Sequence, residues 1–202
     1  RVFGAMPLTD TSSHTYNVEL VKQLSPAMRA KIAHYGAPMD AGHDYDEDGK
    51  ADPALFHSDS CVFGMFLSGS DYARVLQTLE VNPAATGIQP IPGDFDGDGR
   101  ADPAVYDPIA GQLKVLFSSQ AYALQTLTVG DAGCVPIAGD FDGDGKADPA
   151  LYSAAAGRMT AWLSTADYAA MGTPMGGAGW LNASADYDGD GKTDPAVYNP
   201  GS

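Results

Sequence analysis

The chain has 202 residues, enough to bury the core of one sizeable domain, and its 26 acidic against 11 basic residues give a formal net charge of −15. This charge excludes most nucleic-acid binders, because a protein that grips phosphates needs an excess of Lys and Arg. No stretch approaches the ~18 consecutive apolar residues of a membrane-spanning helix, and residues 1–20 lack the basic start and apolar run of a signal peptide.

The N-terminal part of the chain predicts two strands and a short helix. Residues 1–24 begin with a segment that reads like the one starting at Cys61, so we expect them to form the outer strands of a sheet. A helix is predicted over residues 25–36, because Ser25 is a favourable N-cap and Gly36 a favourable stop. We expect this helix to be an amphipathic insertion packed on the sheets; the alternative is a helix that docks a partner.

Four acidic segments follow, with their first aspartates 50, 46 and 46 residues apart. Each reads Asp-x-Asp-x-Asp-Gly-x-x-Asp and continues Pro-Ala, and their aspartates account for 16 of the 26 acidic residues. We call them loops 1 to 4 and number nine positions in each; they span Asp44–Asp52, Asp94–Asp102, Asp140–Asp148 and Asp186–Asp194. Self-similarity at a fixed period is typical of a repeat architecture.

The segments around the loops are strand-like. In the second unit we expect strands at residues 103–106, 112–117 and 124–129, with a turn at 107–111 and an apolar run at 88–95 before the loop. Four short strands in about 46 residues is the size of one propeller blade. Blades are therefore expected to start near positions 40, 90 and 136. Four independent hairpins are the alternative, but each hairpin would have too little core to be stable alone.

The fourth unit has room for only two strands, in residues 180–202. The expected fold is all-β: a single-domain β-propeller over residues 1–202, with four blades of four antiparallel strands. Residues 1–24 and 180–202 would share one blade and close the ring, which leaves no bare edge. Alternatively, the missing strands come from a neighbouring molecule, and the chains would then form filaments.

The composition of the loops indicates a metal site. Side chains at positions 1, 3, 5 and 9 can converge if the backbone curls tightly, and Gly at position 6 tolerates the positive φ of such a curl. All candidate ligands are oxygens, several of them anionic, which favours a hard cation and Ca²⁺ over Mg²⁺. The alternative is four solvated acidic turns, in which the carboxylates would repel one another strongly. An EF-hand is excluded, because position 12 is never Glu.

The pattern Asp-(Phe/Tyr)-Asp-Gly-Asp-Gly-(Lys/Arg)-x-Asp resembles the FG-GAP and VCBS repeats of integrin-α-type calcium propellers, over roughly residues 37–202. The resemblance implies one Ca²⁺ per loop, four in all, held by the side chains at positions 1, 3, 5 and 9 and the backbone carbonyl at position 7. The implied ligands are Asp44, Asp46, Asp48, Lys50 and Asp52; Asp94, Asp96, Asp98, Arg100 and Asp102; Asp140, Asp142, Asp144, Lys146 and Asp148; Asp186, Asp188, Asp190, Lys192 and Asp194.

Loop 1 departs from this pattern, with His43 in front of it and Glu47 in place of Gly at position 4. The best-known propellers of the family have seven blades, whereas this chain has material for four.

The resemblance also implies a function. It points to a secreted or cell-surface, non-catalytic module for adhesion or for binding a carbohydrate or an extracellular protein. No enzyme is expected, because the four histidines fall at unrelated repeat positions and none lies in a motif with a nucleophile. The alternatives are a structural subunit of a surface assembly or filament, in which the chain self-assembles, and an accessory domain of a secreted hydrolase.

Two smaller features stay open at this level. Trp162 and Trp180 do not recur between units, and either could stack on a sugar ring or pack in the core. Cys61 and Cys134 belong to units that would lie opposite each other in a four-bladed ring, so the sequence does not decide whether they are bonded.

Overall fold

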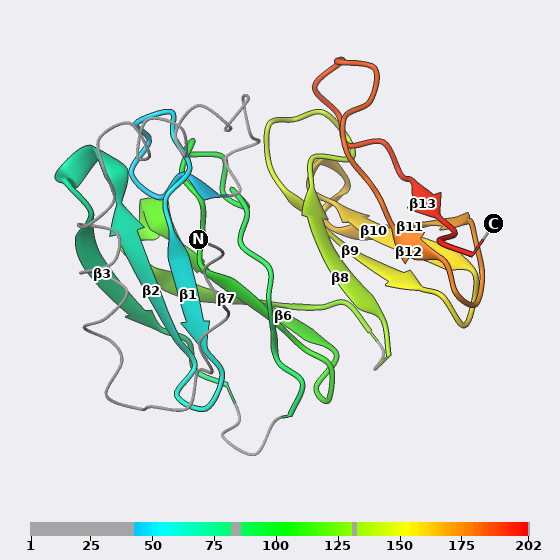
Figure 1. Cartoon of the computed structure of the whole chain (residues 1–202), viewed down its shortest axis with the longest axis horizontal. Coiled ribbons are helices and arrows are strands. Elements are labelled where there is room, and N and C mark those ends of the chain that lie inside the picture. The colour runs from blue at the N-terminus through cyan, green and yellow to red at the C-terminus, as the bar shows by residue number, and fades with distance from the viewer. Residues whose placement is uncertain (1–42, 82–85, 131–132, 202) are drawn as a thin grey trace, which may run out of the picture.

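A computed structural model describes residues 43–81, 86–130 and 133–201. The secondary structure of these residues consists of β-strands and short 3₁₀ turns, and the strands form four antiparallel sheets (Figure 1). The predicted all-β class is confirmed. The expected outer strands in residues 1–24 and the helix at 25–36 lie outside the described residues.

The sheets follow one another along the chain, and within each sheet consecutive strands are neighbours. The first contains β1 (Ala54–His57), β2 (Val62–Leu67) and β3 (Ala73–Thr78). The second contains β4 (Gln89–Pro90), β5 (Ala104–Asp107), β6 (Gln112–Phe117) and β7 (Ala123–Thr128). The third contains β8 (Val135–Gly139), β9 (Asp148–Ser153), β10 (Arg158–Leu163) and β11 (Ala169–Pro174). The fourth contains β12 (Leu181–Asn182) and β13 (Val197–Tyr198).

The strand predictions for the second unit agree closely with these bounds. The strand expected at residues 112–117 coincides with β6, and the one at 124–129 is displaced by one residue from β7. Loops 2, 3 and 4 lie between the first and second strands of their sheets, and loop 1 lies before β1. All four loops therefore occupy equivalent places in their units.

Each turn between the second and third strands of a unit needs a residue with positive φ. Gly111 and Gly157 supply it in the second and third units, at φ +63° and +60°. Cys61 takes the equivalent place in the first unit at φ +51°, a conformation that is strained for a residue with a Cβ. Cys61 and Cys134 are both free thiols.

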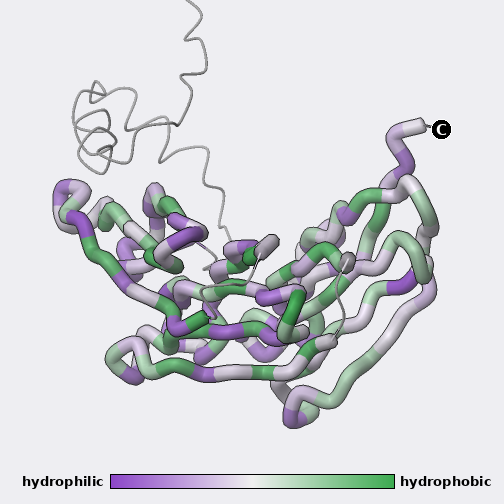
Figure 2. Tube along the Cα trace, turned by 90° about the horizontal axis from the view of Figure 1, so that it is seen from below, coloured by the Kyte–Doolittle hydropathy of each residue, from purple (hydrophilic) through white to green (hydrophobic). Residues whose placement is uncertain are grey.

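Hydrophobic clusters join each sheet to the next. Val105 and Leu116 of the second sheet pack with Phe63 of the first, and Leu151 of the third sheet packs in the cluster around Tyr106. Trp180 and Val197 bring the fourth unit against the third. Figure 2 shows hydrophobic and hydrophilic residues interspersed along the Cα trace. In the second sheet, which has a neighbour on each side, β5 is buried at every residue.

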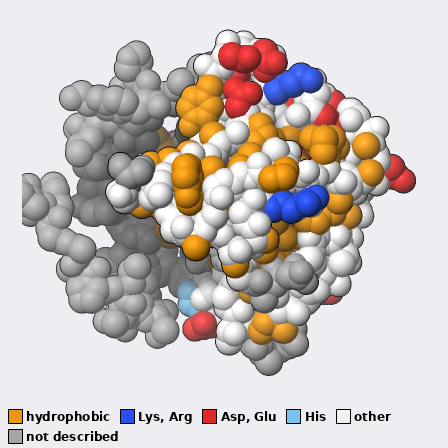
Figure 3. Space-filling model, turned by 90° about the vertical axis from the view of Figure 1, so that its right-hand side faces the viewer, with side chains coloured by type: hydrophobic (Ala, Val, Ile, Leu, Met, Phe, Trp, Pro, Cys, Tyr) orange, Lys and Arg blue, Asp and Glu red, His pale blue; other side chains and the backbone are white. Residues whose placement is uncertain are grey.

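The fourth sheet has fewer strands and is less covered than the others. Tyr187 and Tyr198 are 64% and 52% exposed, whereas the equivalent Phe95 and Tyr106 are 2% and 0% exposed. Figure 3 shows apolar side chains at the surface on this side of the molecule, near a group of carboxylates. Across the described ranges, no backbone hydrogen bond joins the fourth sheet to the first, so closure of the ring stays a prediction. Within the same ranges, no helix has the length and apolar character needed to cross a membrane.

Candidate metal centres

The carboxylate at position 1 organises the backbone of every loop. In loop 2, Oδ1 of Asp94 accepts the N–H of Gly97 at 2.6 Å and Oδ2 accepts the N–H of Gly99 at 2.9 Å. The same pair of bonds, to positions 4 and 6, recurs from Asp44, Asp140 and Asp186. The residues at positions 4 and 6 have positive φ in all four loops. Position 6 is always Gly, whereas position 4 is Gly in loops 2 to 4 and Glu47, at φ +64°, in loop 1. Asx-type bonds of this kind hold the loop in a tight curl.

The carboxylate at position 9 ties the loop to its sheet. In loop 2, fully buried Asp102 accepts the N–H of Phe95 at 2.9 Å and the N–H of Ser118 at 2.7 Å. Asp52 and Asp148 make the equivalent pairs of bonds. Position 9 thus bridges the start of its loop and the end of the third strand of its unit.

A 3₁₀ turn holds the outer carboxylates of loops 1 to 3, and we call it the clasp turn. The clasp turns are Ser68–Ser70, Ser118–Gln120 and Ser164–Ala166, which follow β2, β6 and β10. In the second unit, the Ser118 hydroxyl donates to Oδ2 of Asp98 at 2.8 Å, and the Ser119 hydroxyl donates to Oδ2 of Asp96 at 2.7 Å. Ser68 and Ser164 bind position 5 of their loops in the same way.

The clasp serines were missed by the sequence reasoning, although a signal for them exists. A Ser stands 24 residues after the first aspartate of loops 1, 2 and 3, and it is always followed four residues later by Tyr. These tyrosines, Tyr72, Tyr122 and Tyr168, have positive φ and end the turn before the next strand.

Each loop brings three carboxylates together. In every triad one oxygen of each residue lies within 4.8 Å of the others. The triads are Asp44, Asp46 and Asp48; Asp94, Asp96 and Asp102; Asp140, Asp142 and Asp148; Asp186, Asp188 and Asp194. Loops 2 to 4 thus assemble positions 1, 3 and 9, and loop 1 assembles positions 1, 3 and 5.

The remaining predicted ligands lie around these triads. Position 5 in loops 2 to 4 (Asp98, Asp144 and Asp190) accepts the N–H of position 7 at 2.8–2.9 Å, as Asp48 does in loop 1. Asp52 accepts its two backbone bonds in loop 1 but is not among the three convergent oxygens there. The donors at position 7 are Lys50, Arg100, Lys146 and Lys192.

The carboxylates of the triads are compensated unequally. In loop 1, Nζ of Lys50 lies 2.7 Å from Oδ2 of Asp48, and hydrogen bonds from Lys50 and Ser68 outweigh burial and lower the pKa of Asp48. In loop 2 the pKa of Asp102 is raised to about 7, because burial and the nearby charge of Asp96 outweigh the hydrogen bonds from Ser118 and Phe95. Burial also raises the pKa of Asp94 and of Asp148. A cation between the carboxylates would reverse this shift, because an opposite charge favours the ionised form.

In the part of the chain that the structure describes, two carboxylate oxygens are buried without any hydrogen-bond partner. They are Oδ1 of Asp46 in loop 1 and Oδ1 of Asp142 in loop 3, both at position 3. Their other oxygens, Oδ2, are held by the clasp turns, through Gly69 at 3.0 Å and Thr165 at 2.6 Å. A buried anionic oxygen without a partner is unfavourable, so the residues of loops 1 and 3 fit a hard cation at the centre of their triads. In loops 2 and 4 the equivalent oxygens of Asp96 and Asp188 accept the N–H of position 5 at 3.2 and 3.1 Å.

No protein-family model and no curated protein matches this chain. The likeness of its loops to FG-GAP and VCBS repeats therefore rests on the loop sequences.

The two tryptophans pack in hydrophobic clusters. Trp162 is partly buried against the cluster around Tyr106, and Trp180 is partly buried against the cluster around Tyr152. Both positions contribute to packing between neighbouring units.

Proposed function

We propose that each of the four loops binds one Ca²⁺ ion and that the chain is a calcium-stabilised member of the FG-GAP/VCBS class. The observation that carries this proposal is the pair of buried, unpartnered carboxylate oxygens of Asp46 and Asp142, each within a triad of convergent carboxylates. Carboxylates at positions 1, 3, 5 and 9 and the carbonyl at position 7 would hold the ion. Its charge would offset the repulsion within the triad.

The charge of the whole chain supports the same proposal. The formal net charge is −15, and most of the acidic residues lie in the loops. Four doubly charged cations would offset about half of it, whereas an uncompensated excess destabilises a compact state through self-repulsion.

Counting the bound ions tests this proposal. The unmodified chain is expected to bind four Ca²⁺ ions in equilibrium dialysis followed by elemental analysis. Asp96→Asn removes one anionic oxygen from the triad of loop 2 and should reduce the count to three. Asp59→Asn, in the exposed turn after β1, removes the same charge outside the loops and should leave four. A count that falls equally in both variants, or no bound ion at all, would contradict the assignment.

We further propose that the sheets are blades of a four-bladed ring that residues 1–24 complete on the fourth sheet. The exposure of Tyr187 and Tyr198, whose equivalents are buried, supports a missing covering strand pair. Gly189 supports it too: among the described residues, no atom lies within 4 Å of a Cβ built at this position, while Gly97 and Gly143 are covered by a lysine of the following loop. In a closed ring, loop 1 would follow loop 4 and supply Lys50.

The mass of the particle in solution distinguishes a ring closed within one chain from strand exchange between chains. Light scattering behind a sizing column, in Ca²⁺, should give the 21.0 kDa of one chain. A series of multiples of that mass would contradict closure within one chain and favour the filament alternative, which the exposed fourth sheet also fits.

The biological role proposed for this ring is a secreted or cell-surface, non-catalytic module that binds a carbohydrate or an extracellular protein. A rigid ring whose loops all lie at one place in their units suits recognition, although fold alone does not name the ligand. A glycan array and a panel of extracellular proteins, probed in Ca²⁺ and in EDTA, test this role. Binding that is lost in EDTA is expected, and calcium-dependent polymerisation without any binding would favour the structural subunit instead.

A further inference from the structure

Successive loops are joined directly to one another through their backbones. The N–H at position 8 of one loop donates to the carbonyl at position 1 of the loop before it. Ala101 donates to Asp44 at 2.6 Å, Ala147 donates to Asp94 at 2.6 Å, and Thr193 makes the same bond to Asp140. The bond therefore occurs at all three loop-to-loop junctions among the described residues.

This N–H belongs to the same peptide unit as the carbonyl at position 7. The described residues contain no cis peptide bond, so the N–H and the C=O of this unit point in opposite directions. Because the N–H of Ala147 points to loop 2, the carbonyl of Lys146 points away from loop 2 and is available to its own loop. One rigid peptide plane thus connects the proposed ligand at position 7 with the residue that provides the first ligand of the preceding loop.

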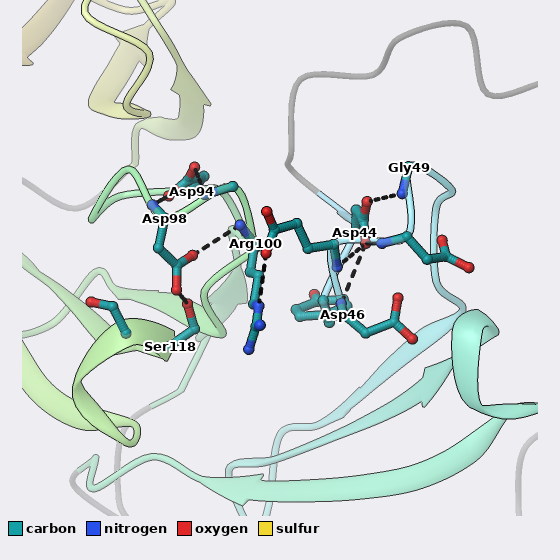
Figure 4. A network of polar contacts seen from close by, with 12 residues as sticks. Asp44, Asp46, Gly49, Asp94, Asp98, Arg100 and Ser118 are labelled. Atoms are coloured by element: carbon teal, nitrogen blue, oxygen red, sulfur yellow. Dashed lines mark hydrogen bonds and ion pairs between the residues drawn. The ribbon is translucent and has the colours of Figure 1, made fainter.

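The side chain at position 7 makes a second connection to the preceding loop. Nε of Arg100 lies 3.6 Å from Oε2 of Glu47 in loop 1 (Figure 4). Nζ of Lys192 donates to the carbonyl of Asp142 at 2.8 Å in loop 3. The stem of Lys146 covers Gly97, where an added Cβ would lie 3.0 Å from Cε of the lysine.

The fit between adjacent loops is close enough to transmit a displacement. A Cβ at Gly93 would lie 2.9 Å from Cβ of Ala147, so only Gly permits this approach. A Cβ at Gly139 would lie 2.6 Å from Oγ1 of Thr193. A change in the position of one loop must therefore change the position of its neighbour, because tightly packed groups do not move independently.

We infer that the four loops form a row of coupled calcium sites, in which occupancy of one loop raises the affinity of its neighbours and not that of more distant loops. The inference rests on the proposed calcium binding. A cation that holds the carbonyl at position 7 fixes the peptide plane and strengthens its N–H as a donor to the preceding loop. Coupling of this kind is reciprocal, so the preceding loop affects the following one by the same factor.

Site-resolved titration of the full chain tests this inference. The backbone amides of Gly49, Gly99, Gly145 and Gly191, at position 6 of the four loops, report each loop separately by NMR during a Ca²⁺ titration. Asp142→Asn weakens loop 3. The midpoints of Gly99 and Gly191 should then move to higher Ca²⁺, on the order of fivefold, and the midpoint of Gly49 should not move.

Asp188→Asn is the matched variant, since it makes the same change at position 3 of loop 4. It should move the midpoint of Gly145 by a similar factor and leave that of Gly99 in place. Coupling is refuted if neighbouring midpoints stay within about twofold of the unmodified chain, or if neighbouring and non-neighbouring loops move equally. Calcium binding itself is refuted if none of the four amides responds in the unmodified chain, which separates failure of the two proposals.

Discussion

Replacing Tyr45 by Phe should stabilise the protein. Tyr45 occupies position 2 of loop 1, is 3% exposed, and its hydroxyl is buried without a hydrogen-bond partner. Burial, with the negative charges of Asp52 and Asp102 nearby, raises its pKa, so the hydroxyl stays neutral. A buried, unsatisfied polar group costs about 1–3 kcal/mol, and little packing is lost with one oxygen atom. We expect Tyr45→Phe to raise the free energy of unfolding by about 1 kcal/mol.

The loop should tolerate this change, because position 2 is already Phe in loops 2 and 3. Tyr106→Phe is the matched control: it makes the same chemical change at a fully buried tyrosine whose hydroxyl donates to the carbonyl of Gly130 at 3.0 Å. It should lower the free energy of unfolding by about 0.5–1.5 kcal/mol.

Urea unfolding in saturating Ca²⁺, followed by circular dichroism, measures both variants. The expected midpoints move in opposite directions, with Tyr45→Phe above the unmodified chain and Tyr106→Phe below it. The reasoning is refuted if Tyr45→Phe is destabilised by as much as Tyr106→Phe, since the Tyr45 hydroxyl would then make a favourable contact.

Three further changes test other parts of the account. Ser118→Ala removes the hydroxyl that holds Asp98, so calorimetry should show one of the four Ca²⁺ ions bound about fivefold more weakly, corresponding to roughly 1 kcal/mol. Glu47→Gly relieves a positive φ at the expense of an exposed contact with Arg100, and thermal melting should show a gain of up to about 1 kcal/mol. Without Ca²⁺, the folded state holds the proton of Asp102 more tightly than the unfolded chain does, because its folded pKa is about 7 against a usual 3.8. Stability in EDTA should therefore fall as the pH rises from about 4 to about 7, and Asp102→Asn should flatten that fall in urea titrations.

The sequence allowed the position and chemistry of the loops to be predicted, because side chains define them. The recurring aspartates, the glycines with positive φ and the alternating strand at residues 112–117 all have a direct sequence signal. An aromatic residue also recurs two positions after each Pro-Ala, and it is buried at Tyr106 and Tyr152, where a neighbouring unit covers it. Tyr198 occupies the equivalent position in the fourth unit and is exposed, because burial depends on the next unit and not on the residue type.

The contacts between loops could not be predicted, because they are made by backbone atoms. The bond from Ala147 to Asp94 uses an N–H and a carbonyl that every residue except Pro provides, so it leaves no pattern in the sequence. The clasp by Ser118 was missed for a different reason: the serine recurs visibly in the sequence, but its contact with Asp98 joins residues 20 positions apart and is made only by the fold of the unit.

Thermal unfolding in Ca²⁺ and in EDTA tests the central claim most directly. If the carboxylate triads are completed by bound ions, an ion at 100 times its dissociation constant adds about 2.7 kcal/mol per site. The unfolding temperature should then be higher in Ca²⁺ than in EDTA by at least about 5 °C for a chain of this size, and should rise with the Ca²⁺ concentration. An unfolding temperature that is the same in Ca²⁺ and in EDTA would contradict the account.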